Sequence, residues 1–141
     1  MLIGIIGESC TGKSTLAERL KAQLNAEVYT GKDYLRLAKN EAIALKLFIK
    51  RLEEAKNGDS VIYVITDKEL LALLPEGAVR ILMTADLVLI EGRFAQRMRG
   101  VLPPPVKTML ERKHGLFDNE RSDNHIHNGE NAAAVCAALS K

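Results

Sequence analysis

The pattern of apolar and polar positions changes period repeatedly along the chain, and this alternation predicts strands separated by helices. Short continuous apolar runs between polar residues are typical of strands buried in a parallel sheet. The predicted strands are residues 2–6, 27–30, 60–66, 79–83 and 124–127. Because each strand is followed by a helical pattern, we expect an α/β fold with three αβα layers around a five-stranded parallel sheet.

Apolar residues that recur every three or four positions predict the helices. The first of these has Leu16, Leu20 and Leu24 on one stripe. The predicted helices are residues 13–24, 33–56, 68–74, 86–99, 106–116 and 131–139. Residues 33–56 are expected to form one long helix, which the pair Asn57 and Gly58 would terminate.

Three consecutive prolines, 103–105, interrupt the helical pattern in the second half of the chain. Successive prolines cannot continue a helix and favour a stiff, extended connection. Pro104 and Pro105 are nevertheless compatible with the first turn of the helix that follows. The sequence therefore predicts two helices joined by a rigid tip at residues 101–105.

The 141 residues of the chain are expected to form one domain, residues 1–141, around a single core. The 20 basic and 18 acidic residues give a net charge of +2, which is too small for general affinity for nucleic acids or membranes. We find neither an apolar run of membrane-spanning length nor a secretory signal pattern. The expectation is a cytoplasmic protein, a monomer or homodimer, with a small molecule as its partner.

The segment from Gly7 to Ser14 fits the pattern G-x-x-x-x-G-K-[ST] directly after the first predicted strand. Glycines permit backbone angles that turn successive N–H groups toward a polyphosphate, and the following helix adds its positive end. Lys13 would reach the β- and γ-phosphates of ATP, and Ser14 would bind Mg²⁺. The expected nucleotide-binding residues are Gly7, Ser9, Cys10, Thr11, Gly12, Lys13, Ser14 and Thr15.

Two carboxylates lie at the carboxyl ends of predicted strands, where ligands bind in doubly wound sheets. Asp33 follows the second strand and is a candidate general base or acceptor-orienting group, or alternatively a helix N-cap. Asp67 follows the third strand, as a metal-binding aspartate does in phosphate-loop proteins, and would bind Mg²⁺ through water. Capping of the next helix is the alternative interpretation for Asp67.

Five cations flank the proline-rich tip and suggest a lid at residues 93–113. Phosphoryl transfer requires neutralisation of charge on the transferring group, and cations on a closing segment supply it. Arg97 and Arg112 are the expected catalytic members, and the alternative is a solvated basic surface. The five cations are Arg93, Arg97, Arg99, Arg112 and Lys113.

His125 and His127 alternate on one face of the last predicted strand, a spacing that suggests a pair of metal ligands. No third ligand is evident from the sequence, so an ordinary surface strand is the favoured interpretation.

The chain resembles the small nucleoside-monophosphate kinase group of P-loop proteins, which includes adenylate, cytidylate and shikimate kinases. Beyond the loop, residues 33–36 (Asp-Tyr-Leu-Arg) resemble the Asp-Met-Leu-Arg segment of adenylate kinases. The stretch from residue 79 to residue 85 resembles the fourth strand and following helix of cytidylate kinases, and residues 123–129 resemble the final strand and turn beside which the adenine lies in these kinases. The resemblance implies a P-loop NTPase fold with a short lid, in which Arg36 grips the phosphate of the acceptor.

This resemblance implies ATP-dependent transfer of the γ-phosphoryl group to a small acceptor, with a nucleoside monophosphate favoured. Asp33, Arg36 and Arg93 are the expected substrate-binding residues. Two departures keep alternatives open: Lys68 and Glu69 replace the usual Gly-Phe-Pro, and residues 33–57 read as one helix instead of a separate subdomain. The alternatives are a metabolite kinase of the shikimate-kinase kind and a nucleotide-binding regulatory ATPase.

Overall fold

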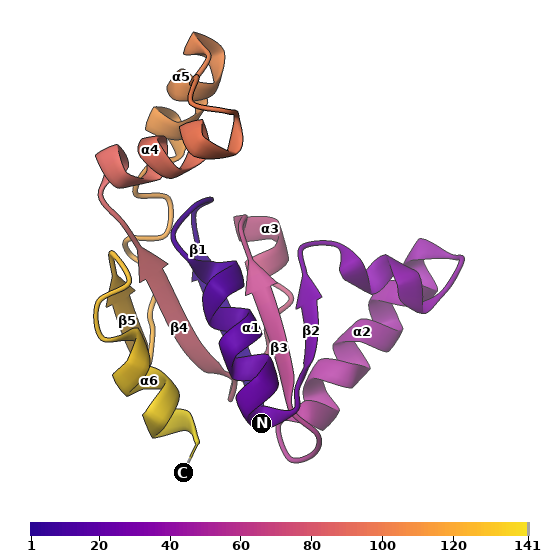
Figure 1. The fold of residues 1–141 in the computed structure, drawn as a ribbon. Helices are drawn as coiled ribbons and strands as arrows, with labels where there is room; N and C mark the ends of the chain where they lie inside the picture. The colour runs from indigo at the N-terminus through magenta and orange to yellow at the C-terminus, as the bar shows by residue number, and fades with distance from the viewer. Residues whose placement is uncertain (141) are drawn as a thin grey trace.

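A five-stranded parallel sheet with helices on both faces forms the centre of the protein in a computed structural model that describes residues 1–140 (Figure 1). The first half of the chain contains β1 (Leu2–Gly7), α1 (Lys13–Leu24), β2 (Glu27–Thr30), η1 (Asp33–Leu37), α2 (Glu41–Ala55) and β3 (Val61–Ile65). The second half contains α3 (Lys68–Leu71), β4 (Val79–Thr84), α4 (Leu87–Arg97), α5 (Pro104–Lys113), β5 (Asn124–His127) and α6 (Ala132–Leu139). The predicted fold class and all five predicted strands are confirmed, with end positions that differ by at most one residue.

The strand order β2-β3-β1-β4-β5 places β1 in the middle of the sheet. All four pairings are parallel, and Gly7 at the end of β1 lies opposite Met83 of β4. The six residues of β1 are all buried, which explains why this strand is continuously apolar. The carboxyl ends of the strands therefore meet at one edge, where the segment between β1 and α1 lies.

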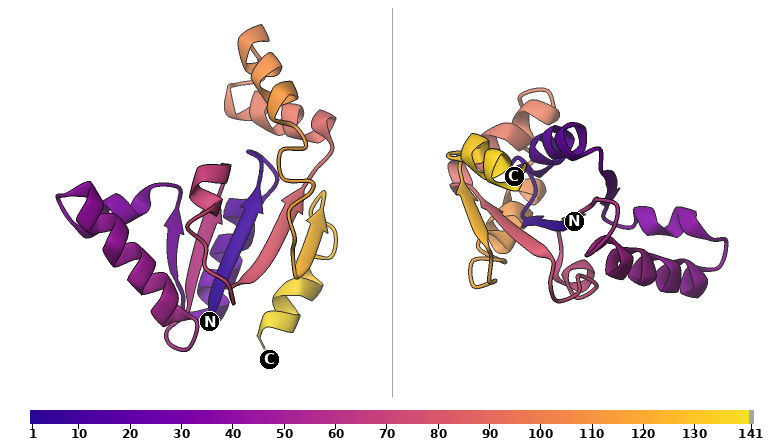
Figure 2. Two further views of the ribbon diagram at one scale, coloured as in Figure 1. Left: turned by 180° about the vertical axis from the view of Figure 1, so that it is seen from behind. Right: turned by 90° about the horizontal axis from the view of Figure 1, so that it is seen from below.

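Alternate residues of each strand face two separate cores. On one face Leu2 and Ile6 of β1 pack with Phe48 and Leu52 of α2. On the other face Ile3 and Ile5 pack with residues of α1 and α6. These two apolar clusters produce the three layers that are visible in Figure 2.

The prediction of a single helix over residues 33–56 is wrong. Residues Asp33–Leu37 form a 3₁₀ helix, and Ala38 then adopts an extended conformation with φ of −160°. The α-helix begins only after Asn40, whose side-chain oxygen accepts a hydrogen bond from the backbone N–H of Ile43 at 3.1 Å. An asparagine satisfies a free N–H at a helix start better than it serves a helix interior, and the pattern of apolar positions does not report this.

Helices α4 and α5 form the predicted pair of helices and project beyond the carboxyl ends of the strands (Figure 1). Helix α5 begins at Pro104, two residues earlier than predicted, because proline tolerates the first turn and Pro103 O accepts from Val106 N and Lys107 N. The pair packs on a third apolar cluster, which includes Ile90, Leu110 and the loop residue Cys10. Below we call residues 87–113 the lid.

None of the helices within residues 1–140 is both long enough and apolar enough to span a bilayer.

Candidate active site

The loop between β1 and α1 adopts the cradle-like shape that its glycines predict. Gly7 has no space for a side chain, because a Cβ there would overlap the carbonyl oxygen of Met83 and lie 2.9 Å from Thr11 Oγ1. Cys10 and Gly12 have φ angles of 64° and 97°, which turn the chain sharply between the strand and the helix. The tight approach of β1 to β4 thus fixes the position of the loop at the centre of the sheet.

Lys13 is the most unusual ionisable group of this loop. Its side chain is buried, and its Nζ donates a hydrogen bond to the backbone oxygen of Glu8. Burial, and to a smaller extent the nearby Arg97 guanidinium, lowers the pKa of Lys13 to about 8. A lysine whose charge is poorly solvated gains most when an anion is placed beside it, so Lys13 suits a phosphate ligand.

A cavity of about 150 Å³ lies over the loop. Its walls come from the loop, from the carboxyl ends of β2 and β3, and from Arg97 of α4. The lining residues are Ser9, Cys10, Gly12, Lys13, Ser14, Thr15, Thr30, Val64, Thr66 and Arg97. Six of the eight residues expected to bind nucleotide therefore line one cavity, and the remaining two, Gly7 and Thr11, lie in contact within the same loop.

A second cavity, of about 340 Å³, lies beside the first and shares Cys10, Gly12, Thr15 and Arg97 with it. It extends between α1, α4 and the turn after β5. Its other lining residues are Thr11, Leu16, Arg19, Met83, Arg93, Gly129 and Ala132. The sequence resemblance implies that the adenine ring lies beside this turn. The second cavity adjoins the turn at Gly129 and is therefore the candidate site for the adenine.

Arg19 is a candidate site residue that sequence reasoning missed. It lies four residues after Thr15 on α1, so both side chains occupy the same face of the helix. That spacing is the signal that would have found it, because Thr15 was already expected to bind nucleotide.

The lid cations divide into two groups. Arg93 donates from Nη1 to the backbone oxygen of Cys10 at 2.9 Å, and Arg97 lines both cavities. Arg99 and Arg112 are exposed and are not among the residues that line either cavity. The structure therefore places Arg93 and Arg97 of α4 against the loop between β1 and α1. Lys113 of α5 lines a smaller cavity with Glu8 and Ser9 of the same loop, whereas Arg99 and Arg112 line none of these cavities.

The candidate acceptor residues lie next to the phosphate cavity, but their side chains have local partners. Asp33 Oδ2 accepts a hydrogen bond from the backbone N–H of Thr30 at 2.9 Å, and Thr30 lines the cavity. Arg36 lies 3.8 Å from a carboxylate oxygen of Glu27 and stacks over the ring of Tyr29 at 4.5 Å. Arg36 is thus directed along β2 and away from the loop.

Of the two residues assigned to Mg²⁺, one lines the cavity over the loop and the other follows a lining residue in the chain. Ser14 lines the cavity directly, and Asp67 follows Thr66, which also lines it. Asp67 Oδ1 accepts from Leu70 N at 3.0 Å, so this carboxylate caps α3. One hydroxyl and one nearby carboxylate fit a Mg²⁺ ion that takes its other ligands from phosphates and water. Within residues 1–140 no cluster of three or more His, Cys, Asp or Glu side chains offers a different metal site.

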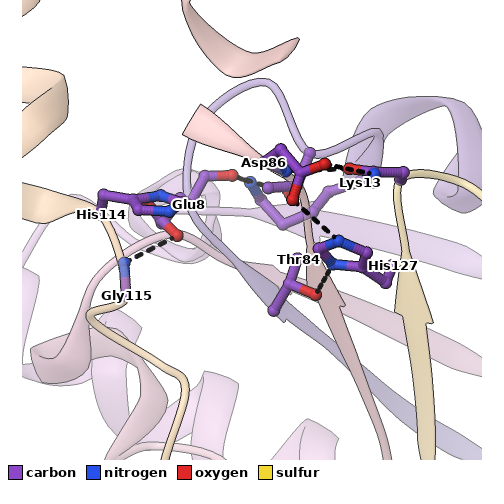
Figure 3. Close-up of polar contacts among 9 residues, drawn as sticks. Glu8, Lys13, Thr84, Asp86, His114, Gly115 and His127 are labelled. Carbon is purple, nitrogen blue, oxygen red and sulfur yellow. Dashed lines mark hydrogen bonds and ion pairs between the residues drawn. The ribbon is translucent and has the colours of Figure 1, made fainter. Parts of the chain in front are cut away.

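The two histidines of β5 belong to a polar network at the start of the lid, and Figure 3 shows the part of it that contains Thr84, Asp86 and His127. Thr84 Oγ1 lies 2.6 Å from His125 Nε2 and 2.8 Å from His127 Nδ1. His127 Nε2 lies 3.1 Å from Asp86, and the hydrogen bonds from Asn128 and His127 lower the pKa of that carboxyl group. The network ties the turn after β5 to the residue that precedes α4.

No family model matches the chain, and no curated protein sequence matches it. Solved structures are similar over almost its full length. A shikimate kinase from Acinetobacter baumannii in complex with shikimate is 12% identical, with 98% of this chain and 92% of that chain covered and a TM-score of 0.65. A gluconokinase from Sinorhizobium meliloti is 14% identical, with the same coverages and a TM-score of 0.60.

An uncharacterised protein from Eubacterium ventriosum is 16% identical, with 99% of this chain and 95% of that chain covered and a TM-score of 0.65. These similarities show that the chain has the P-loop fold of small kinases, as the sequence resemblance implied. At such low identity they establish the fold and not the reaction.

Proposed function

We propose that this protein, which has the fold of small P-loop kinases, transfers the γ-phosphoryl group of ATP to a small-molecule acceptor. The observation that carries the proposal is the convergence of Lys13, Arg93 and Arg97 on the loop between β1 and α1. The loop alone would bind nucleotide. Cations from a projecting helix pair supply, in addition, the neutralising charge that phosphoryl transfer requires.

In the proposed reaction each residue acts by position and charge. The backbone N–H groups of the loop and Lys13 hold the β- and γ-phosphates, and Ser14, with Asp67 through water, holds the Mg²⁺ ion. That ion would neutralise charge on the β- and γ-phosphate oxygens. Arg97, which lines the cavity over the loop, is the residue that we expect to neutralise charge on the γ-phosphoryl group during transfer. Asp33, at the end of β2, orients the acceptor hydroxyl or accepts its proton.

The acceptor that we favour is a small hydroxylated metabolite. A nucleoside monophosphate, which the sequence resemblance favours, requires a cation for its phosphate, and the residue assigned to this role is Arg36. Because Arg36 lies against Glu27 and Tyr29, it would first have to leave both. The named shikimate kinase and gluconokinase neighbours fit a metabolite acceptor. A nucleoside monophosphate remains the second acceptor class to test.

ATP turnover with and without a panel of acceptors tests the proposal. The panel contains polyhydroxylated acids, sugars, shikimate and the nucleoside monophosphates. We expect ADP production that depends on one acceptor class and is lost in Lys13→Ala, because in the proposed reaction Lys13 holds the β- and γ-phosphates. Lys21→Ala, which removes an exposed lysine from the same helix, is the matched control and should retain activity.

Turnover that is independent of every acceptor would instead favour a regulatory ATPase. Wild-type turnover in Lys13→Ala would contradict the assignment of the phosphate-binding loop.

A further inference from the structure

Glu8 is a buried carboxylate inside the phosphate-binding loop, at a position where the loop pattern accepts any residue. Its side chain is only 9% exposed. Glu8 Oε1 lies 3.2 Å from His114 Nδ1, and Glu8 Oε2 accepts from the backbone N–H of Gly115 at 3.2 Å (Figure 3). Both carboxylate oxygens are thus engaged by residues that lie more than one hundred positions later in the chain.

The surroundings of Glu8 make these two contacts necessary. A small cavity of about 40 Å³ beside it is lined by Ile90 of α4, by Met109, Leu110 and Lys113 of α5, and by Ser9, Thr66 and Leu116. A carboxylate covered in this way cannot exchange its partners freely for water, and an unpaired one would be costly. The contacts to His114 and Gly115 therefore connect the loop to the end of the lid, and the carboxylate that makes them is buried.

The residues that Glu8 holds are the exit from the lid. Helix α5 ends at Lys113, and Gly115 has a φ of 83°, which reverses the chain direction toward the sheet. Two residues later Phe117 is buried in the apolar core between the sheet and α2. Any rotation of α5 relative to the sheet must be taken up between Lys113 and Phe117, where Glu8 is attached.

The backbone of the same residue faces the phosphate site. Glu8 O accepts from Lys13 Nζ and from Thr11 Oγ1, the latter at 2.8 Å. A phosphate would compete with this oxygen for the ammonium group of Lys13. The backbone oxygen of Glu8 contacts the phosphate site, and its carboxylate contacts His114 and Gly115. Because both groups belong to one residue, a displacement of the Glu8 backbone also displaces its contacts with the end of the lid.

We propose that Glu8 is a positioning residue that couples occupancy of the phosphate-binding loop to the placement of the lid. The inference rests on the proposed function for its role in transfer, but it concerns a contact that the loop pattern does not specify. When the phosphates bind Lys13, the hydrogen bond from Lys13 Nζ to Glu8 O is lost and Glu8 shifts. His114 and Gly115, which contact the Glu8 carboxylate, move with it. Helix α5 then moves relative to α4, and the lid closes over the site.

Hydrogen exchange of the lid with and without a non-hydrolysable ATP analogue and Mg²⁺ tests the coupling. In the wild type we expect exchange over residues 93–115 to slow when the analogue binds. In Glu8→Gln the analogue should still bind with nearly unchanged affinity, but this protection should be lost, and kcat with a productive acceptor should fall roughly tenfold while KM for ATP changes little. Glu111→Gln removes an exposed carboxylate from α5 and is the matched control, expected to behave as wild type.

His114→Asn approaches the same contact from the lid and keeps the test available if Glu8→Gln does not fold. It should reproduce the loss of protection. A double variant should lose no more than either single variant, because both remove one interaction. Unchanged protection and an unchanged kcat in Glu8→Gln and in His114→Asn would overturn the proposal, as would equal loss of protection in Glu111→Gln.

The outcome is separable from that of the proposed function. If the ATP analogue protects the lid in the wild type but not in Glu8→Gln, and the wild type transfers phosphate to no acceptor, the coupling is supported and the proposed kinase activity is contradicted. A chain that phosphorylates an acceptor equally well with Glu8→Gln supports the kinase and contradicts the coupling.

Discussion

The lid joins the rest of the molecule at two junctions, and each junction pairs one carboxylate with one histidine in different surroundings. At its start Asp86 lies 3.1 Å from His127, and the side chain of that aspartate is 68% exposed. At its end Glu8 lies 3.2 Å from His114, and the side chain of that glutamate is 9% exposed. The first pair connects the lid to the edge strand β5, and the second connects it to the phosphate-binding loop at the centre of the sheet.

The comparison shows that burial, and not the chemical type of a pair, determines what the pair does. An exposed carboxylate that loses its histidine is solvated by water, whereas a buried carboxylate must keep its partners. The two lid helices also differ in their arginines: Arg93 and Arg97 of α4 lie at the loop and its cavities, whereas Arg112 of α5 lines none of them. The cation that α5 brings near the loop is Lys113, beside Glu8. We infer that α4 supplies charge to the site and that α5 transmits position.

The largest difference between the two helices is expected in catalysis. Arg97→Ala should lower kcat roughly ten- to hundredfold, which corresponds to about 1.4 to 2.7 kcal/mol, because its charge is needed most when the phosphoryl group is in transfer. ATP binding should weaken less. Arg112→Ala should have a much smaller effect on kcat. Steady-state kinetics of both variants provide the measurement, and an equal loss in Arg112→Ala would show that Arg112 also acts at the site.

Removal of the histidine should lower the free energy of unfolding by different amounts at the two junctions. His114→Ala leaves Glu8 buried with only the Gly115 N–H as a partner for its carboxylate, so the free energy of unfolding should fall by about 1 to 3 kcal/mol. His127→Ala leaves an exposed Asp86 that water can solvate, and the loss should be clearly smaller. Urea denaturation measures both. Equal losses would remove the distinction that burial is expected to make.

Two glycines with similar backbone angles distinguish the exit of the lid from its tip. Gly115 has a φ of 83° and Gly100 a φ of 88°. Alanine at either position costs about 1 kcal/mol because left-handed backbone is unfavourable for residues with a Cβ. Gly115→Ala should cost more than Gly100→Ala, since its Cβ would lie 3.1 Å from Asp118 Oδ2 whereas nothing lies within 4 Å at Gly100. Thermal unfolding of the two variants tests this order.

The smallest expected effect is a shift in the pH dependence of ATP binding. The pKa of Lys13 is about 8, so ATP affinity should fall as the pH rises through 8 and the ammonium group loses its proton. Arg97→Ala removes a positive charge that lowers this pKa, and the fall in affinity should move to higher pH. Arg112→Ala should leave it in place. Calorimetric titration between pH 7 and 9.5 measures the position, and a shift of the same size in both variants would contradict the assignment of Arg97.

The sequence predicted the strands better than the helix boundaries, and the reason is physical. A continuously apolar segment such as β1 has few alternatives to the middle of a sheet, because both of its faces must be buried. Residues 33–56 have helical periodicity throughout, but the choice between one helix and two depends on Asn40 satisfying the N–H of Ile43. Periodicity records which positions are apolar and does not record such local hydrogen bonds.

The loop of the candidate site was also accessible to sequence reasoning, because its glycines and lysine have fixed spacing within one short segment. The lining of the larger cavity, beside α1, could be predicted from the sequence only in part. Arg19 follows from helical spacing once Thr15 is assigned, whereas Gly129 and Ala132 reach the same cavity from the other end of the chain.

The sequence by itself determined the parallel αβα architecture, the glycine-containing loop between β1 and α1 and the pair of helices interrupted by prolines, since the signal for each lies in residues that are neighbours in the chain. Only the tertiary structure decided that Arg36 lies along β2, that Arg97 and not Arg112 lines the phosphate cavity, and that Glu8 holds Gly115. These facts depend on contacts between segments up to 107 residues apart and on which side chains those contacts bury. Spacing along the chain contains no information about either until the sheet brings the segments together.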